Sequence, residues 1–548
     1  MKLPSAKNHA PHLAFVAFSA AAVLTACGQQ MSPQAYAPMP AVVVASPPPP
    51  PDGMTRGEQY AKLAENPFRI ASAEAVSTFS ADVDTASYSN VRRFLMGESH
   101  LPPPEAVRIE ELLNYFSYDY PAPTEGAPIA ASLEVSDCPW AQGHELVRIG
   151  LQAKQVDTAN LPPRNLVFLL DVSGSMMPEN RLPMVKKGLR MLVDQLTAKD
   201  TVSIVTYAGA SGIALPPTPG DQKGAIVSAL SRLEAGGSTN GAEGIKLAYF
   251  LAQKSFVAGG INRVILSTDG DFNVGVTSTS ELTKLIEEER RTGVYLSVLG
   301  VGEGNLHDAT MEMLADKGNG NYAYLDRLSE ARKVLVTQAG STLITVANDV
   351  KIQAEFDPAQ VRSYRLVGYE NRVLRNEDFN DDSKDAGDMG AGHSVTALYE
   401  VEPVAQGPVA TRSGAPVVAV AGSAAKSAPL VKVVAERPML TLRVRYKDPG
   451  QSESRLLTFA TGASHPLSEA SGDFRFAAAV ASFGLVLRDS QFKGSATLPM
   501  VDELAASAVP SSGQEAHDPG GYRAEFRQLV NQAELLGGSR KNAVGVAR

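Results

Sequence analysis

The sequence predicts an α/β fold in which a central domain with a doubly wound, mainly parallel sheet is flanked by a smaller N-terminal α+β domain and a β-rich C-terminal domain. Between residues 164 and 345, short β-rich runs alternate with amphipathic helical stretches, as in βαβ units. Several of these runs are apolar throughout, which is typical of strands covered on both faces. Beyond residue 350 the signal turns β-like.

The central domain has five candidate strands, at 165–170, 201–207, 263–268, 294–299 and 322–325. Amphipathic helices fill the gaps between them. The first of these helices carries one apolar stripe, formed by Leu182, Val185, Leu189, Leu192, Val193 and Leu196. Shorter stripes follow at Ile226, Leu230 and Leu233 and at Leu282, Leu285 and Ile286.

The flanking regions are less regular. Apolar residues at helical spacing in 91–95 and 109–116, on either side of Pro102-Pro103-Pro104, predict two short helices, and 133–151 predicts strands leading into the central domain. After the centre we expect strands at 350–356, 364–369, 394–401 and 439–446 and a buried helix at 474–487. The predicted domains are 57–162, 163–345 and 346–548, with a flexible insertion at 403–430.

The N-terminus has the features of an export signal. Lys2 and Lys7 precede an apolar stretch at 13–23, which ends in Leu24-Thr25-Ala26-Cys27. This ending resembles the lipobox of bacterial lipoproteins, which implies a signal peptide at 1–26, a lipidated Cys27 and a Pro-rich tether at 27–56. Gly28 favours the outer membrane if the host has two membranes. An ordinary signal peptide with an incidental Cys27 is the alternative, and both interpretations export the protein.

Charge and cysteine content restrict the possible partners. The formal charge is -9, and no block of Lys or Arg occurs, so nucleic acid is not expected as a partner. The chain has two cysteines, and lipidation of Cys27 would leave Cys138 alone. We therefore expect no intramolecular disulfide and interpret Cys138 as a small buried residue, with intermolecular pairing as the minor alternative.

Three segments of the central domain carry candidate ligands. Asp171-Val172-Ser173-Gly174-Ser175 follows the first strand, where ligands bind in open α/β sheets. Alone, this D-x-S-x-S pattern could be a turn that caps the next helix. However, Gly236-Gly237-Ser238-Thr239-Asn240 precedes another helix, and Ser267-Thr268-Asp269-Gly270 ends another strand. Their side chains could converge on Asp171.

These segments together resemble the von Willebrand factor A (VWA) domain, a Rossmann-like fold with a metal-ion-dependent adhesion site. The resemblance implies that Ser173, Ser175 and Thr239 supply hydroxyl oxygens, while Asp171 and Asp269 act mostly through bound water. Hard oxygen ligands suit Mg²⁺, with Mn²⁺ or Ca²⁺ as alternatives. The implied function is binding of a protein partner that offers an Asp or Glu side chain to the metal.

The likeness extends beyond the central domain to bacterial VWA lipoproteins of the YfbK type. It is carried by three segments, at 82–93, 269–275 and 392–399. The resemblance therefore spans nearly all of 57–548, with the insertion as the visible departure. It implies no biochemical role for the flanking domains.

An enzyme is not expected, because H-E-x-x-H, G-x-S-x-G and P-loop motifs are absent from the sequence. Ser423-Ala424-Ala425-Lys426 has the spacing of penicillin-binding enzymes but lies in the insertion. A metal-assisted hydrolase and a metal-independent structural scaffold remain as alternatives. Five Asp residues without EF-hand spacing are interpreted as a solvated loop: Asp378, Asp381, Asp382, Asp385 and Asp388.

Overall fold

The computed structural model describes residues 57–546 except 82–83, 125, 157–160, 238–240, 271–278, 339–343, 405–436, 509–517 and 519. The predicted signal peptide and tether, Cys27, Thr239 and most of the 403–430 insertion lie outside the described residues. Residues from Thr55 onward form one compact unit, so the predicted domain limits within it stay a prediction.

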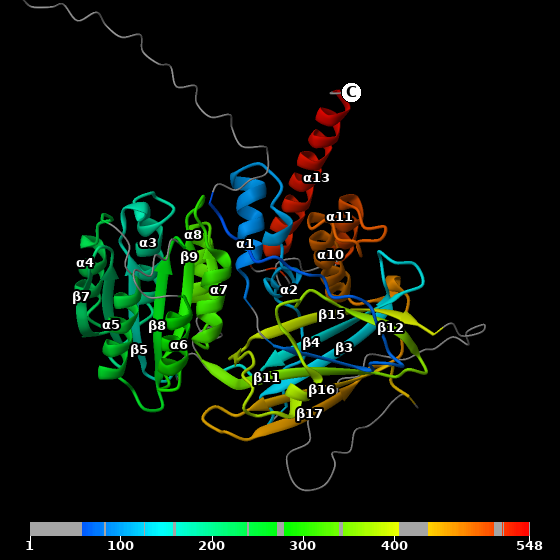
Figure 1. Cartoon of the computed structure of the whole chain (residues 1–548), viewed down its shortest axis with the longest axis horizontal. Coiled ribbons are helices and arrows are strands. Elements are labelled where there is room, and N and C mark those ends of the chain that lie inside the picture. Colours follow the sequence, from blue (N-terminus) through cyan, green and yellow to red (C-terminus); the bar gives the residue numbers. More distant parts are fainter. Residues whose placement is uncertain are drawn as a thin grey trace, which may run out of the picture. The chain divides into compact units, whose positions relative to one another are not determined.

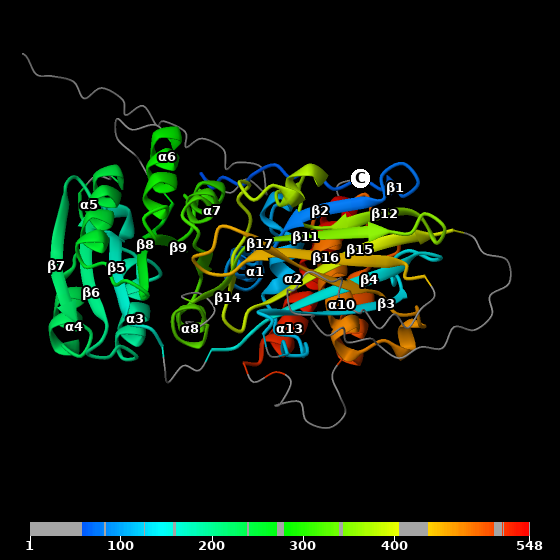
Figure 2. The same ribbon diagram turned by 90° about the horizontal axis from the view of Figure 1, so that it is seen from below.

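The central sheet has six strands in the order β10-β9-β8-β5-β6-β7. Figure 2 labels the part of this sheet from β9 to β7, with β7 at the left. Five run parallel, and β7 lies antiparallel to β6. The bounds are β5 (Arg164–Asp171), β6 (Thr201–Tyr207), β7 (Ser211–Pro219), β8 (Ile261–Thr268), β9 (Tyr295–Val301) and β10 (Tyr322–Leu325). The five predicted strands are confirmed. The sequence analysis did not predict β7, which contains several prolines. The sheet tolerates them because β7 is an edge strand, where a missing backbone N–H leaves no partner strand unpaired.

Helices cover both faces of this sheet (Figure 1). Alternate residues of β5 show the arrangement: Phe168 packs in one core, and Val167 and Leu169 pack in the other. The first face holds α3 (Leu182–Val193), α4 (Lys223–Arg232) and α8 (Leu328–Arg332); the second holds α5 (Gly241–Lys254), α6 (Thr279–Arg290) and α7 (Asp308–Lys317). The doubly wound α/β fold is therefore confirmed.

Two further sheets enclose a separate apolar core. One has the order β1-β12-β15-β4-β3 and the other β13-β2-β11-β16-β17, with β14 paired to β11. The core between them includes Ile149 and Tyr399 from the first sheet and Ile352 and Val444 from the second. The bounds are β1 (Arg69–Ile70), β2 (Val76–Ser80), β3 (Ile129–Asp137), β4 (Glu145–Ala153), β11 (Thr345–Phe356), β12 (Val361–Val367), β13 (Val373–Leu374), β14 (Met389–Gly390), β15 (Ser394–Pro403), β16 (Leu440–Lys447) and β17 (Ser454–Ala460).

Both of these sheets combine strands that precede the central domain with strands that follow it. β4 pairs with β15, so that Arg148 lies opposite Leu398, and β2 pairs with β11, so that Phe79 lies opposite Ile352. The strands predicted within 133–151 are confirmed as β3 and β4, which precede β5 in the chain but pair within a flanking sheet. These strands are completed by C-terminal partners, because a strand needs a neighbour with a matching apolar face, wherever it lies in the sequence.

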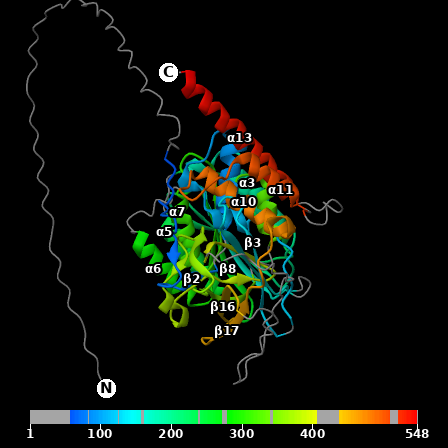
Figure 3. The same cartoon turned by 90° about the vertical axis from the view of Figure 1, so that its right-hand side faces the viewer.

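Helices from both flanks share a third apolar core. They are α1 (Ala86–Arg92), which continues as a π-helix (Arg93–Gly97), α2 (Ile109–Asn114), α10 (Gly472–Leu487), α11 (Leu498–Ser507) and α13 (Tyr522–Val546). Figure 3 shows α10, α11 and α13 close together. The predicted helix at 474–487 is confirmed, whereas α11 and α13 were not predicted. Within the described chain, no helix combines the length and apolarity that a membrane crossing requires.

Short helical turns complete the described structure. Four are 3₁₀-helices, Pro104–Ala106, Gly174–Met176, Asn376–Asn380 and Leu467–Glu469, and Lys333–Thr337 is a π-helix. Cys138 is buried in the helical core, as predicted, and burial raises the pKa of its thiol.

The Asp-rich loop differs in part from its prediction as a solvated segment. Asp382 and Asp385 are exposed, as predicted. Asp378, however, is buried, and Asp388 accepts hydrogen bonds from the Asn348 side chain and the Asp349 backbone. The interpretation of those two residues is wrong: Arg375 donates to the Asp378 carboxylate, and the start of β11 supplies donors to Asp388 that the loop sequence does not reveal.

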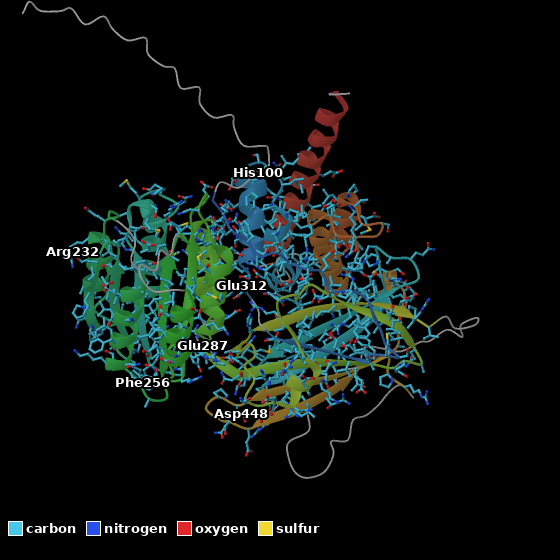
Figure 4. The ribbon with its side chains drawn as sticks, in the orientation of Figure 1. His100, Arg232, Phe256, Glu287, Glu312 and Asp448 are labelled. Atoms are coloured by element: carbon cyan, nitrogen blue, oxygen red, sulfur yellow. The ribbon has the colours of Figure 1, made fainter. Side chains whose placement is uncertain are left out.

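Ion pairs join the central α/β region to the flanking elements. Arg92 of α1 pairs with Asp326 and Glu330 of the central region and with Glu525 of α13. Glu312 of α7, labelled in Figure 4, accepts a hydrogen bond from Arg372, 2.9 Å away. Because most of these side chains are buried, removing one partner would leave an uncompensated buried charge, which costs more than the loss of an exposed pair.

Lys333 lies in the same interface and predicts a pH dependence. Its ammonium donates a hydrogen bond to the Tyr115 carbonyl at 2.9 Å, and burial lowers its pKa from 10.5 to about 7. Between pH 7 and 10.5 the unfolded chain therefore binds more protons at this site than the native protein. We expect the stability of the wild type, relative to Lys333→Met, to rise as pH increases from 7 to about 10.

Urea unfolding at several pH values measures this difference. Lys187→Met is the matched control, because the Lys187 side chain is 60% exposed. The stability of Lys187→Met relative to the wild type should stay constant between pH 7 and about 10. A constant difference for Lys333→Met as well would show that Lys333 keeps an ordinary pKa.

Candidate metal centre

The carboxyl ends of β5 and β8 bring two of the predicted segments together. The strands are parallel neighbours, and their register places Leu170 opposite Ser267. Asp171 and Thr268 therefore end the two strands at the same edge, and the Thr268 hydroxyl donates a hydrogen bond to Asp171 Oδ2 at 3.2 Å. Asp269 follows directly. The structure therefore places Asp171 and Asp269 at the same edge of the sheet.

The turn after β5 orders the two serines around Asp171. The Ser173 backbone N–H donates to Asp171 Oδ1 at 2.8 Å, and the Ser173 and Ser175 hydroxyl oxygens lie 3.0 Å apart. Ser173 is the last residue before a 3₁₀ turn, Gly174–Met176, that leads toward α3. The D-x-S-x-S segment thus presents a carboxylate and two hydroxyls on one short turn.

The third predicted segment is described only up to Gly237. Gly236 N–H donates to the Val172 carbonyl at 2.7 Å, and the Gly237 carbonyl accepts from Gly174 N–H at 3.0 Å. The backbone that leads to Thr239 is therefore fixed against the D-x-S-x-S turn. Thr239 itself lies outside the described residues, so its role as a ligand stays a prediction.

Burial gives this cluster its electrostatic character. Asp171 and Asp269 are both fully buried. Burial raises the pKa of Asp171, the hydrogen bonds from Ser173 oppose that shift, and the Asp269 carboxylate adds to it. The two buried carboxylates carry two negative charges, and Arg181, which pairs with Asp269, compensates one of them. The cluster therefore fits a divalent ion.

The donor chemistry points to the same kind of ion. Carboxylate and hydroxyl oxygens are hard ligands that suit Mg²⁺, Mn²⁺ or Ca²⁺. In the described part of the chain, no group of three or more His, Cys, Asp or Glu side chains could hold a metal. A site that relies on serine hydroxyls does not need such a group.

Two residues near the site were not predicted. Arg181 pairs with Asp269 at 2.5 Å, and the Asn305 side-chain amide donates to the same oxygen at 3.2 Å. One sequence signal could have indicated Arg181: it immediately precedes α3, and a cation is unfavourable at a helix N-terminus unless an anion holds it there. Asn305 gave no signal, because it belongs to the loop after a different strand.

Comparisons with known proteins agree with this fold. Models of the von Willebrand factor type A domain, von Willebrand factor, and the C-terminal part of the uncharacterized protein YfbK match residues 165–338, 54–148 and 341–536, respectively. YfbK of Escherichia coli (strain K12) is 42% identical over 484 residues, which cover 87% of this chain and 81% of that protein. The chain belongs to the YfbK family of VWA proteins.

More distant relatives have lower sequence identity. The uncharacterized protein sll0103 of Synechocystis is 29% identical over 185 residues, 34% of this chain and 43% of that protein. The solved structure of a von Willebrand factor type A protein from Catenulispora acidiphila covers 82% of this chain and 89% of its own, with 13% identity and a TM-score of 0.37. VWA domains typically mediate protein–protein interactions, and this family member carries such a domain.

Proposed function

We propose that this YfbK-family protein is a cell-envelope lipoprotein that binds a divalent metal in its VWA domain and, through the metal, a partner protein. The proposed ligands are Asp171, Ser173, Ser175, Thr239 and Asp269. The observation that carries the proposal is the convergence of a buried Asp171, two serine hydroxyls and a buried Asp269 at one edge of the sheet. When bound, Mg²⁺ would supply a Lewis-acidic position open to a carboxylate oxygen.

The proposed ligands would contribute differently to the binding of such an ion. Ser173 and Ser175 offer neutral oxygens, which leave the ion electron-poor, and the two aspartates supply the negative charge that retains it. Thr268 and the Ser173 backbone orient the Asp171 carboxylate. An acidic side chain of a partner is therefore the favoured ligand, and nucleic acid is disfavoured by the net charge of -9.

Localisation rests on sequence alone. The proposed anchor is a lipidated Cys27 at the end of an export signal, which would attach the protein to the outer membrane of a two-membrane host. A metal-independent scaffold is the competing function. The two serine hydroxyls beside the buried Asp171 and Asp269 favour the metal-dependent one, since this set of hard oxygen donors suits a divalent ion.

Isothermal titration of Mg²⁺, Mn²⁺ and Ca²⁺ into the full chain tests the proposal. We expect the wild type to bind one ion, and Asp171→Ala or the double change Ser173→Ala with Ser175→Ala to bind at least about tenfold more weakly. Asp194→Ala is the control, because Asp194 is an exposed carboxylate just after α3. If the wild type binds no ion, or if all variants bind equally, the scaffold replaces the metal-dependent function.

A further inference from the structure

Arg181 is built into the candidate metal centre. Its side chain is 11% exposed. One guanidinium nitrogen donates to Asp269 Oδ2 at 2.5 Å and to the Ser175 carbonyl at 2.8 Å. The other donates to the Glu303 carbonyl at 2.7 Å and to Asn305 Oδ1 at 2.9 Å. The guanidinium thus joins both metal-binding segments to the loop after β9.

Gly302 makes room for this side chain. A Cβ atom added at Gly302 would lie 2.2 Å from Arg181 Nε and 2.8 Å from its Cγ. Gly302 also has a φ of +78°, a conformation that glycine adopts without strain. The slot for Arg181 is therefore a defined feature of the fold, and the side chain is not one of many rotamers of a surface arginine.

The charges show what Arg181 does at this place. Asp171 and Asp269 contribute two negative charges, and Arg181 contributes one positive charge. A divalent ion would share Asp269 with the guanidinium and experience its repulsion. The same positive charge would add to the attraction of the occupied site for an anion.

We propose that Arg181 is a second, permanent cation of the metal centre, which weakens metal binding and strengthens the binding of an acidic ligand to the occupied site. This inference rests on the proposed function, because it requires that a metal binds. It assigns Arg181 as a positioning and specificity-determining residue. With Arg181 present, the centre would favour binding of a carboxylate to the occupied site over tight binding of the metal itself.

Titration of Mg²⁺ into the full chain and into Arg181→Gln tests the first half. We expect Arg181→Gln to bind Mg²⁺ about tenfold more tightly, since it removes one positive charge next to the ion. Arg190→Gln is the matched control, because Arg190 is an exposed arginine of α3 and the charge change is the same. Its Mg²⁺ affinity should stay within about twofold of the wild type, since distant exposed charges are screened.

Acetate tests the second half. With Mn²⁺ in the site, the paramagnetic relaxation of acetate protons measures binding of a carboxylate near the ion. We expect acetate to bind Arg181→Gln several-fold more weakly than the wild type at saturating Mn²⁺, and Arg190→Gln to match the wild type. Stronger metal binding with weaker acetate binding is a combination that simple damage to the site would not produce.

The outcomes separate this inference from the proposed function. Equal or weaker Mg²⁺ binding by Arg181→Gln, with a wild type that binds, overturns the role of Arg181 and leaves the metal site intact. Absence of binding to the wild type and to Arg181→Gln overturns both. If Arg181→Gln does not fold, Gly302→Ala displaces the guanidinium instead, and unchanged or weaker Mg²⁺ binding by that variant overturns the role of Arg181.

Discussion

Replacement of Arg108 by methionine is expected to lower the free energy of unfolding by about 3–5 kcal/mol, because it leaves buried carboxylates without their cation. Arg108 pairs with Glu111 of α2 and with Asp308 at the start of α7, and the three side chains are at most 3% exposed. Burial already raises the pKa of Glu111 to about 7 despite the opposing effect of Arg108. Methionine keeps the apolar part of the side chain, so the decrease in the free energy of unfolding measures the effect of removing the positive charge.

Urea unfolding of the full chain measures this effect. Arg362→Ala is the control: Arg362 is 70% exposed and pairs with Glu402, so its removal should change stability by less than about 1 kcal/mol. Adding Asp308→Asn to Arg108→Met should restore part of the loss, since one uncompensated charge is removed. A loss below 1 kcal/mol for Arg108→Met would show that the interface tolerates the unpaired carboxylates.

Replacement of Gly270 by alanine is expected to cost about 2–4 kcal/mol and to impair metal binding. Gly270 has a φ of +92°, and an added Cβ would lie 2.5 Å from the backbone nitrogen of His307. The left-handed conformation costs a residue with a Cβ about 1–2 kcal/mol, and the overlap with the backbone adds to this. Relief requires the 302–307 loop to move away from Asp269, although Asn305 of that loop holds Asp269.

Gly259→Ala separates the two contributions. Gly259 also has a positive φ, of +71°, but no atom lies within 4 Å of an added Cβ. This control should lose only the conformational part and should bind Mg²⁺ like the wild type. Equal losses of stability for the two variants, with equal Mg²⁺ affinity in titration, would contradict the close approach at Gly270.

The central sheet could be predicted because each of its predicted strands is recognisable from the apolar pattern of its own short segment. Apolar runs such as 165–170 and 201–207 need only their own sequence to be recognised as buried strands, and the stripe on α3 needs only helical spacing. The edge strand β7 was missed because three of its residues are prolines. α13 was missed because its apolar residues gave no clear stripe, and it packs against a core that other segments complete.

In the candidate site, too, some residues could be predicted from local sequence and others depend on tertiary contacts. Asp171, Ser173, Ser175 and Asp269 stand directly after predicted strands, so parallel topology was sufficient to bring them to one edge. Arg181 could be suspected only as a cation at a helix N-terminus. Asn305 and the contact between Gly270 and His307 depend on the distance between two loops, which no spacing in the sequence encodes.

The sequence by itself determined the α/β centre, the family likeness and four of the proposed ligands now seen together, since each depends on short-range pattern. Only the tertiary structure decided that strands from both flanks share two sheets, that buried ion pairs such as Arg108 with Asp308 join these flanks to α7, and that Arg181 contacts Asp269. The physical reason is that backbone pairing and charge compensation select partners by proximity in space, and sequence separation does not limit that choice.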